Sequence, residues 1–229
     1  MKKILPLILC LILSPALHAK EDWGMWFSNT LQTDFGGSRY LAFLELAPRF
    51  KNDNSDFSQL IMRPLLGYKL NDNLQLWLGY TWQGEYNDKS SVKFDNATHD
   101  VMQQLQWLQD LTPELNFQYR FRLEQRFFAD ADLAHRIRQR FRLQYSLPDS
   151  KLYLIAFDEL FIYLNSFNSG PREHSVQSGI NQNRSYAGLG YKVTPQINVD
   201  TGYQLQYVNN FGEPDLFNHV WLTNVNIKF

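Results

Sequence analysis

Arginine recurs at every second position in two segments near the middle of the chain. Residues 120–126 place Glu124 between arginines, and residues 136–142 carry arginine at each even position. A guanidinium group is always charged and donates hydrogen bonds in a planar fork that matches carboxylate and phosphate groups. These residues therefore predict either a network of ion pairs or a site that holds an anion. The arginines are Arg120, Arg122, Arg126, Arg136, Arg138, Arg140 and Arg142.

The arginines need more carboxylates than Glu124 alone, because buried charges are costly without partners. Asp158 and Glu159 are the nearest acids in the following segment. Pairing the segments about their connections places Glu124 opposite Arg138 and Asp158 opposite Arg140. Glu159 would then face the other side, so we predict a β-bulge that turns both acids toward the arginines. Further charged candidates are Glu45, Arg184 and Asp200.

Five glycines share the inward parity that we predict for the arginines. A repeat carries most of them. The segment Leu-Gly-Tyr-Lys occurs at 66–69 and again at 189–192, each time shortly before a three-residue turn, and a Gly-Tyr pair follows each turn. Pairing about the turns places Gly67 opposite Trp77, whereas the second hairpin has no large side chain nearby to fill the space. We therefore predict a glycine-lined wall across from the arginine wall. The glycines are Gly67, Gly79, Gly188, Gly190 and Gly202.

Two pairs of adjacent residues suggest catalysis. His99 and Asp100, and also His174 and Ser175, lie in polar stretches that we expect to be outer loops. Adjacent residues in a loop do not by themselves form the hydrogen bond between a nucleophile and a base. The histidines and acids also lack the spacing of metal ligands. We predict no catalytic residue, no metal site and no cofactor.

The alternation itself identifies the elements, because a side-chain period of two means β-strand. One face of each strand is apolar and the other is polar, as in residues 115–126. No stretch is long and apolar enough for a spanning helix once the first residues are set aside. The predicted strands are 39–50, 58–70, 74–84, 99–109, 114–128, 135–147, 151–164, 182–193, 197–208 and 217–229.

Short connections alternate with longer polar ones between these strands. This alternation, with a polar face opposite an apolar one, is typical of outer-membrane barrels. We predict an all-β fold, a transmembrane antiparallel up-and-down β-barrel of about ten strands. Residues 23–33 also look like a strand, and an eleventh strand would be irregular for a bacterial barrel. Either that segment lies outside the wall or a missed strand brings the count to twelve.

The two ends of the chain carry targeting signals. Residues 1–19 combine a basic start, an apolar run and a small final residue, which predicts a secretory signal peptide cleaved after Ala19. Acylation at Cys10 is the alternative, although a leucine precedes it. Residues 20–229 then form one barrel domain, and the terminal Phe229 resembles the signal read by the barrel assembly machinery. We expect the mature protein in the bacterial outer membrane, in contact with its lipid.

The charge balance argues against nucleic acid as a partner. The chain has 22 Lys+Arg and 23 Asp+Glu, and removal of residues 1–19 takes away Lys2 and Lys3. The mature protein is therefore slightly acidic, unlike most proteins that bind nucleic acid. Cys10 is the single cysteine of the sequence, so the mature chain has neither a disulfide nor a thiolate metal site.

Several of these stretches resemble an uncharacterised bacterial family of outer-membrane barrels, which is catalogued as a domain of unknown function. The resemblance implies the barrel fold and the outer-membrane location for nearly the whole mature chain. It implies no activity and no substrate. The matching stretches are R-L-E-Q-R-F at 122–127, R-I-R-Q-R-F-R-L at 136–143, D-E-L-F at 158–161, N-Q-N-R at 181–184 and the Gly-Tyr pairs at 67–68, 79–80, 190–191 and 202–203.

The sequence thus predicts a barrel with an arginine-rich lumen. We expect a non-enzymatic protein that is either a structural element or a narrow pore for small anionic solutes, with an anionic ligand as a candidate occupant of the lumen. An enzyme that modifies envelope lipid through an outer-loop active site is the alternative hypothesis.

Overall fold

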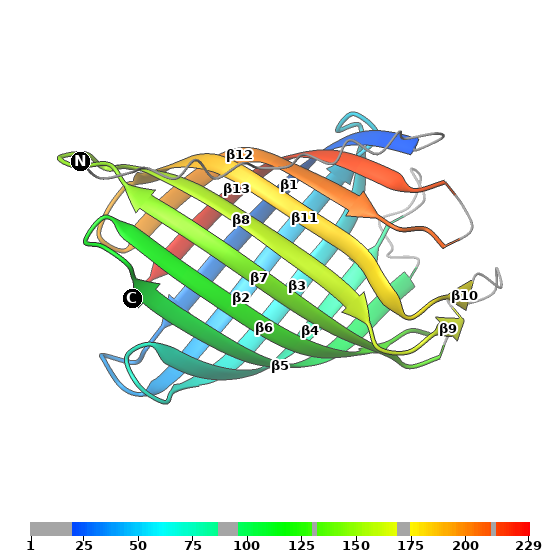
Figure 1. Cartoon of the computed structure of the whole chain (residues 1–229), viewed down its shortest axis with the longest axis horizontal. Coiled ribbons are helices and arrows are strands. Elements are labelled where there is room, and N and C mark those ends of the chain that lie inside the picture. Colours follow the sequence, from blue (N-terminus) through cyan, green and yellow to red (C-terminus); the bar gives the residue numbers. More distant parts are fainter. Residues whose placement is uncertain (1–19, 87–95, 130–131, 169–174, 212–213) are drawn as a thin grey trace, which may run out of the picture.

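Eleven strands of the chain close into one barrel, and the strands are strongly tilted against its axis (Figure 1). The computed structural model describes residues 20–86, 96–129, 132–168, 175–211 and 214–229. Within these ranges, no helix is long and apolar enough to cross a membrane. The all-β closed barrel predicted from the alternating pattern is confirmed.

Consecutive wall strands pair antiparallel, and β11 follows β8 in the wall. The ten predicted strands are all present, with ends that agree to within three residues. Two short strands, β9 (Phe167–Asn168) and β10 (Ser175–Val176), form a separate sheet. The wall consists of β1 (Lys20–Thr33), β2 (Tyr40–Lys51), β3 (Asp56–Lys69), β4 (Leu74–Glu85), β5 (Asn96–Asp110), β6 (Leu115–Phe127), β7 (Ala134–Ser146), β8 (Leu152–Tyr163), β11 (Gly179–Lys192), β12 (Ile197–Val208) and β13 (Leu216–Lys228).

The barrel closes between β1 and β13, which run parallel to each other. Their register extends from Lys20 opposite Leu216 to Gln32 opposite Lys228, while β1 pairs antiparallel with β2. The predicted count of ten or twelve strands is therefore wrong, because the segment that includes 23–33 is a wall strand. The prediction assumed antiparallel closure, but a parallel pair also gives hydrogen-bond partners to both strand edges.

Side chains alternate across the wall, and the polar ones point inward. Arg122, Glu124 and Asp200 are 2%, 0% and 1% exposed, whereas Leu66 and Leu78 on the outer face are 70% and 60% exposed. A water-soluble protein has the reverse arrangement, with apolar side chains buried and charged ones mostly outside. The period-two pattern of the sequence thus becomes a polar lumen inside an apolar outer surface.

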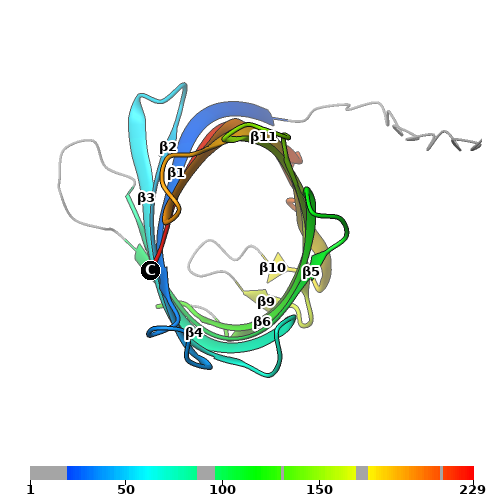
Figure 2. The same ribbon diagram turned by 90° about the vertical axis from the view of Figure 1, so that its left-hand side faces the viewer.

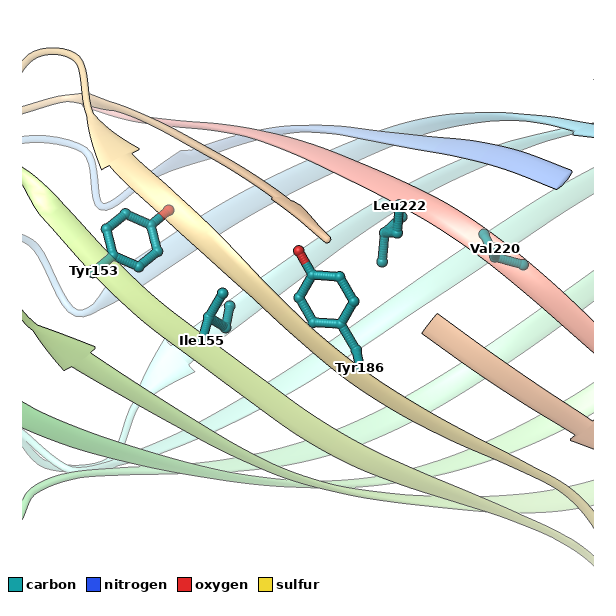
Figure 3. Close-up of a cluster of buried hydrophobic side chains, with 5 residues drawn as sticks. All are labelled: Tyr153, Ile155, Tyr186, Val220 and Leu222. Carbon is teal, nitrogen blue, oxygen red and sulfur yellow. The ribbon is translucent and has the colours of Figure 1, made fainter. Parts of the chain in front are cut away.

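Two clusters of apolar side chains also project into the barrel. Figure 3 shows the first cluster, in which the rings of Tyr153 and Tyr186 reach inward from β8 and β11. Val220 and Leu222 of β13 complete it together with Ile155. The second cluster comes from β2 to β5, and the phenyl ring of Phe43 packs against it. Its members are Leu41, Leu65, Trp77 and Met102.

The sheet of β9 and β10 lies at the barrel end that has the longer connections. Phe167 is 5% exposed and forms a buried cluster with Ala134 and Tyr163, against which Phe128 packs. In the view along the barrel, β9 and β10 lie within the outline of the wall (Figure 2). This sheet therefore lies over part of the opening at that end.

Short turns join the strands at the other end, and their residues specify them locally. In the turn between β1 and β2, the Asp34 carboxylate accepts hydrogen bonds from Lys69 Nζ and from the Gly37 N–H, each at 2.9 Å. Both bonds favour the ionised carboxylate and hold the pKa of Asp34 below its usual range. Gly36 and Gly37 have φ of +75° and +88°, a backbone conformation that favours glycine.

Candidate functional site: a divided, arginine-rich lumen

The lumen contains two cavities, one toward each end of the barrel. The loop-side cavity, of about 370 Å³, reaches residues near the longer connections such as Lys51 and Glu85. The turn-side cavity, of about 330 Å³, reaches Gln144 and Lys228 near the short turns. Both volumes suit a small ligand. The arginines that line them are Arg49, Arg63, Arg126, Arg136, Arg138 and Arg184 in the first and Arg120, Arg122, Arg140 and Arg142 in the second.

A belt of ion pairs lies where the two cavities meet. The Glu124 carboxylate lies 2.5 Å from Arg136 Nη2 and 3.0 Å from Arg138 Nη1. Glu159 Oε1 lies 2.5 Å from Arg120 Nη2 and 2.9 Å from Arg138 Nη2. Because Arg138 lines the loop-side cavity and Arg120 lines the turn-side cavity, the Glu159 carboxylate connects the two linings. We call these five residues the ion-pair belt.

Two more ion pairs extend the network beyond the belt. Arg126 Nε donates a hydrogen bond to Asp100 Oδ1 at 3.0 Å, and its Nη1 donates to the Tyr163 hydroxyl at 3.0 Å. Arg63 forms an ion pair with Glu45. The sequence analysis did not place Arg63 or Asp100 in the lumen. The parity of β3 and β5 was the available signal, since both residues share the inward face of their strands.

Strand β1 contributes an aromatic ring to the loop-side cavity. The guanidinium carbon of Arg49 lies 3.9 Å from the centroid of Trp26, and that of Arg184 lies 5.0 Å from it. Arg184 also lies 4.7 Å from the ring of Phe161. Cations over aromatic faces are attracted by the ring quadrupole. The sequence analysis missed Trp26 because it did not assign 23–33 to the wall.

Glutamine side chains hold the arginines of the turn-side cavity. Arg122 donates to Gln104 Oε1 through Nε at 2.9 Å and through Nη2 at 2.6 Å. Arg140 Nη2 donates to Gln118 Oε1 at 2.9 Å, and Arg142 is bound by a glutamine in the same way. An amide oxygen accepts a hydrogen bond without adding negative charge. Arg140 and Arg142 are therefore oriented by neutral groups, whereas Arg122 Nη1 also lies 3.7 Å from Glu124 Oε1.

The Asp200 carboxylate lines the same cavity and is satisfied by neutral donors. The Tyr186 hydroxyl and the Asn224 amide donate to Oδ1 at 3.0 and 2.7 Å. The Tyr153 hydroxyl and the Asn226 amide donate to Oδ2, each at 3.3 Å. Two of these donors belong to the cluster in Figure 3, so an apolar patch also positions a buried acid.

The structure corrects the predicted partners of Glu124. This residue lies opposite Arg136, while Arg138 lies opposite Arg122. The predicted pairing of Glu124 with Arg138 was wrong by two residues, because β6 ends and β7 begins one residue earlier than expected. A shift of two residues keeps every side chain on its face. All seven predicted arginines of β6 and β7 therefore point into the lumen.

The predicted position of Asp158 was wrong. Glu159 lies opposite Arg140, and the register of β7 and β8 runs without a bulge. Asp158 lies on the exposed outer face, where it accepts hydrogen bonds from Asn183 Nδ2 at 3.0 Å and Ser185 Oγ at 2.7 Å. Of these two adjacent acids, Glu159 therefore faces the lumen and Asp158 does not.

The turn between β7 and β8 explains this difference. The Leu147 N–H donates to the Leu152 carbonyl oxygen at 3.0 Å, which leaves four residues between them. The sequence analysis assumed a turn of three residues. Asp149 adopts a φ of +53° in this turn, a conformation that aspartate tolerates better than most residues. One extra residue in a turn exchanges the inward and outward faces of the following strand.

Four of the five lumen glycines give room to large side chains on their own or neighbouring strands, and the fifth, Gly202, gives room to backbone. A Cβ atom at Gly67 would lie 2.5 Å from the Trp77 ring, and one at Gly79 would lie 2.6 Å from Leu65 Cγ. The Tyr186 and Tyr153 rings lie against Gly188 and Gly190, and the Ala187 backbone lies against Gly202. The pairing of the second hairpin is as predicted, but the prediction that its glycines leave open space was wrong.

The glycine strands flank the arginine strands. In the order of the wall, β3 and β4 lie on one side of β5–β7, and β11 and β12 lie beyond β8 on the other. The predicted placement of a glycine wall directly across from the arginines was therefore wrong.

The structure separates the catalytic candidates that it describes. His99 lies on the outer face, where its Nδ1 forms a hydrogen bond with the Tyr80 hydroxyl. Asp100 points inward to Arg126. His174 and the side chain of Ser175 lie outside the described residues. Within the described ranges, no group of three or more histidine, cysteine or acidic residues lies together as a metal site would require.

Comparisons with known proteins bear on the family and the architecture. Residues 23–218 match the model of a family described as "Protein of unknown function (DUF2490)". An uncharacterised protein of Methylorubrum extorquens is 27% identical over 227 residues, which cover 96% of this chain and 95% of that protein. A solved structure of the NanC porin in a rhombohedral crystal form covers 90% of this chain and 99% of its own, with a TM-score of 0.49 and 14% identity. A structural likeness of this degree carries no argument about function.

Proposed function

This chain belongs to the family described as "Protein of unknown function (DUF2490)", and from that premise we propose that it is an outer-membrane β-barrel that forms a narrow pore for small anionic solutes. The observation that carries the proposal is the excess of arginine over carboxylate in the lumen.

The outer wall supports insertion in a membrane. Its large apolar side chains are widely exposed, among them Leu66, Leu78 and Leu154 at 70%, 60% and 50%. Exposed aromatic rings such as Tyr40 and Tyr191 lie near the short turns. A band of apolar side chains with an aromatic girdle is the pattern of a barrel that faces lipid. The predicted signal peptide at 1–19 would direct such a barrel to the envelope.

The charge of the lumen supports selectivity for anions. Four arginines and Lys228 line the turn-side cavity, whereas its described lining contains two carboxylates, those of Glu45 and Asp200. Glu45 is paired with Arg63, and Asp200 is bound by neutral donors. Arg120 is paired with Glu159, and Glu124 lies 3.7 Å from Arg122, but Arg140 and Arg142 are bound by neutral amides. Positive charge that the wall leaves unbalanced attracts anions and repels cations.

The ion-pair belt supports a narrow passage. Glu159 is 4% exposed and Glu124 is fully buried, so side chains rather than open solvent fill the middle of the barrel. A path between the two cavities would pass beside Arg120 and Arg138. We therefore expect a small conductance, carried by partly dehydrated ions that exchange water for guanidinium groups.

Planar-bilayer recording with the purified full chain tests the proposal. Under a KCl gradient, the reversal potential should have the sign of chloride selectivity, and Arg142→Gln should weaken that selectivity. Lys151→Gln is the matched control, because it removes a positive charge near the same turn but outside the cavity lining. The absence of channels, or channels selective for cations, would contradict the proposed pore.

A further inference from the structure

Four buried hydrogen-bond donors, each on a residue that lines the turn-side cavity, have no acceptor among the described residues. They are Trp77 Nε1, Arg120 Nε, Arg122 Nη1 and Arg140 Nε. Trp77 and Arg122 are 5% and 2% exposed, so bulk water does not replace the missing acceptors freely. Buried donors are usually paired, because an unpaired one loses its bond to water without compensation.

These donors lie together on one wall of the cavity. In the barrel register, Trp77 of β4 lies opposite Gln104 of β5, and Gln104 lies opposite Arg122 of β6. Arg120 is the next inward residue of β6 toward the short turns, and it lies opposite Arg140 of β7. The inward faces of β4, β6 and β7 therefore place an indole and three guanidinium groups along one side of this cavity.

The amide oxygens nearest to this wall already accept hydrogen bonds from its arginines, and they add no negative charge. Gln104 Oε1 takes two bonds from Arg122, and Gln118 Oε1 takes one from Arg140. Glu124 Oε1 lies 3.7 Å from Arg122 Nη1, which is too far for a hydrogen bond. The amides thus fix the directions of the guanidinium groups and leave their remaining N–H groups for another acceptor.

The carboxylates that line this cavity cannot serve as that acceptor. Glu45 accepts from Ser28 Oγ at 2.8 Å and is paired with Arg63. Asp200 is bound by Tyr153, Tyr186 and two asparagines. A partner that accepts from all four donors needs several acceptor oxygens, and a negative charge on it would complement the three guanidinium groups. A carboxylate or phosphate group has these properties, and such groups bind guanidinium forks through two oxygens.

We propose that the wall formed by β4–β7 in the turn-side cavity is a binding site for the carboxylate or phosphate group of a small solute. Trp77, Arg120, Arg122 and Arg140 would donate hydrogen bonds to its oxygens. The cavity of about 330 Å³ leaves room for the rest of a small solute beside Phe43, Leu65 and Ile155. This inference rests on the proposed function, since it names the group that a solute presents to the arginines.

Calorimetric titration of the full-length protein in detergent tests this site directly. Inorganic phosphate and acetate are titrated in separate arms against a constant chloride background. Heat with phosphate alone would identify a phosphate site, and heat with acetate alone a carboxylate site. Arg140→Gln should weaken binding about 10- to 100-fold, the range for the loss of a charge-assisted hydrogen bond. Trp77→Phe should weaken it less, because it removes a neutral donor and keeps an aromatic ring over Gly67.

Arg49→Gln is the matched control for these variants. It removes a lumen arginine that lines the loop-side cavity, so the affinity for phosphate or acetate should stay within about twofold of the parent value. Equal weakening by Arg49→Gln and Arg140→Gln would overturn the site in favour of a diffuse attraction. Titrations without heat in either arm would overturn it as well.

The outcomes separate the site from the pore. An anion-selective pore that gives no binding heat would refute the site and leave the proposed function standing. Binding heat that Arg140→Gln abolishes, in a protein that forms no channels, would support the site and refute the pore. Retained channel formation by Arg140→Gln, with weakened binding, would show that the variant has folded.

Discussion

Glu159 and Asp158 are neighbours in the chain and lie in opposite environments. The Glu159 side chain is bound by Arg120 and Arg138 inside the barrel, with 4% exposed surface. Asp158 accepts hydrogen bonds from two neutral side chains on the outer face. Asp158 can therefore serve as the control for Glu159, because both are carboxylates of β8 and only Glu159 belongs to the ion-pair belt.

Glu159→Gln should destabilise the barrel, because Arg120 loses its carboxylate partner and Arg138 keeps only its pairing with Glu124. Removal of one member of a buried ion pair costs about 3–5 kcal/mol. Asp158→Asn should change the free energy of unfolding by less than about 1 kcal/mol, since an amide oxygen can still accept from Asn183 and Ser185. Urea unfolding in detergent micelles measures both. Equal destabilisation by the two variants would contradict the assignment of Glu159 to the belt.

At the scale of the elements, β1 decides how the barrel closes. It pairs in parallel with β13 and in antiparallel with β2. It also brings Trp26 between Arg49 and Arg184, so the same strand completes the wall and part of the loop-side cavity. A barrel closed without β1 would lack that ring and would place β2 beside β13.

A cysteine pair across the β1–β13 seam tests this closure. Asn29 lies opposite Val225 with both side chains on the outer face, so Asn29→Cys with Val225→Cys should form a disulfide on oxidation. The control pair is Asn29→Cys with Trp221→Cys, which lies four residues away along β13 and should not cross-link. Cys10→Ser removes the natural cysteine from both proteins. Gel mobility without reductant reports the cross-link, and its absence from the first pair would refute the parallel seam.

At the scale of the whole molecule, the barrel has its polar side chains inside and its apolar side chains outside. Such a surface is compatible with lipid or detergent and would aggregate in water. The closed sheet also leaves no free strand edge, which makes the folded barrel resistant to detergent at low temperature.

The mature protein should therefore need detergent for extraction from the membrane fraction. It should migrate faster on a gel before boiling than after it, because the folded barrel is compact and binds less detergent. The measurement is a comparison of heated and unheated samples, with circular dichroism to show β-structure in the unheated one. Full solubility in detergent-free buffer would contradict the proposed membrane location.

Much of this architecture could be predicted from local pattern. Ten strands and the inward parity of the β6 and β7 arginines follow from alternation, because successive side chains of a strand point to opposite faces. The pairings of Gly67 with Trp77 and of Gly188 with Gly202 also follow, because short turns specify register.

Contacts between distant segments were decided only by the tertiary structure. Whether 23–33 joins the wall depends on β2 and β13, and β13 lies almost the whole chain away. Whether Asp158 or Glu159 faces inward depends on whether the turn before β8 has three or four residues. The alternating pattern within β7 or β8 does not indicate that length. The unpaired donors of Trp77, Arg120, Arg122 and Arg140 come together from three strands, β4, β6 and β7. The sequence by itself determined which faces are polar, whereas the closure of the ring determined which polar groups meet.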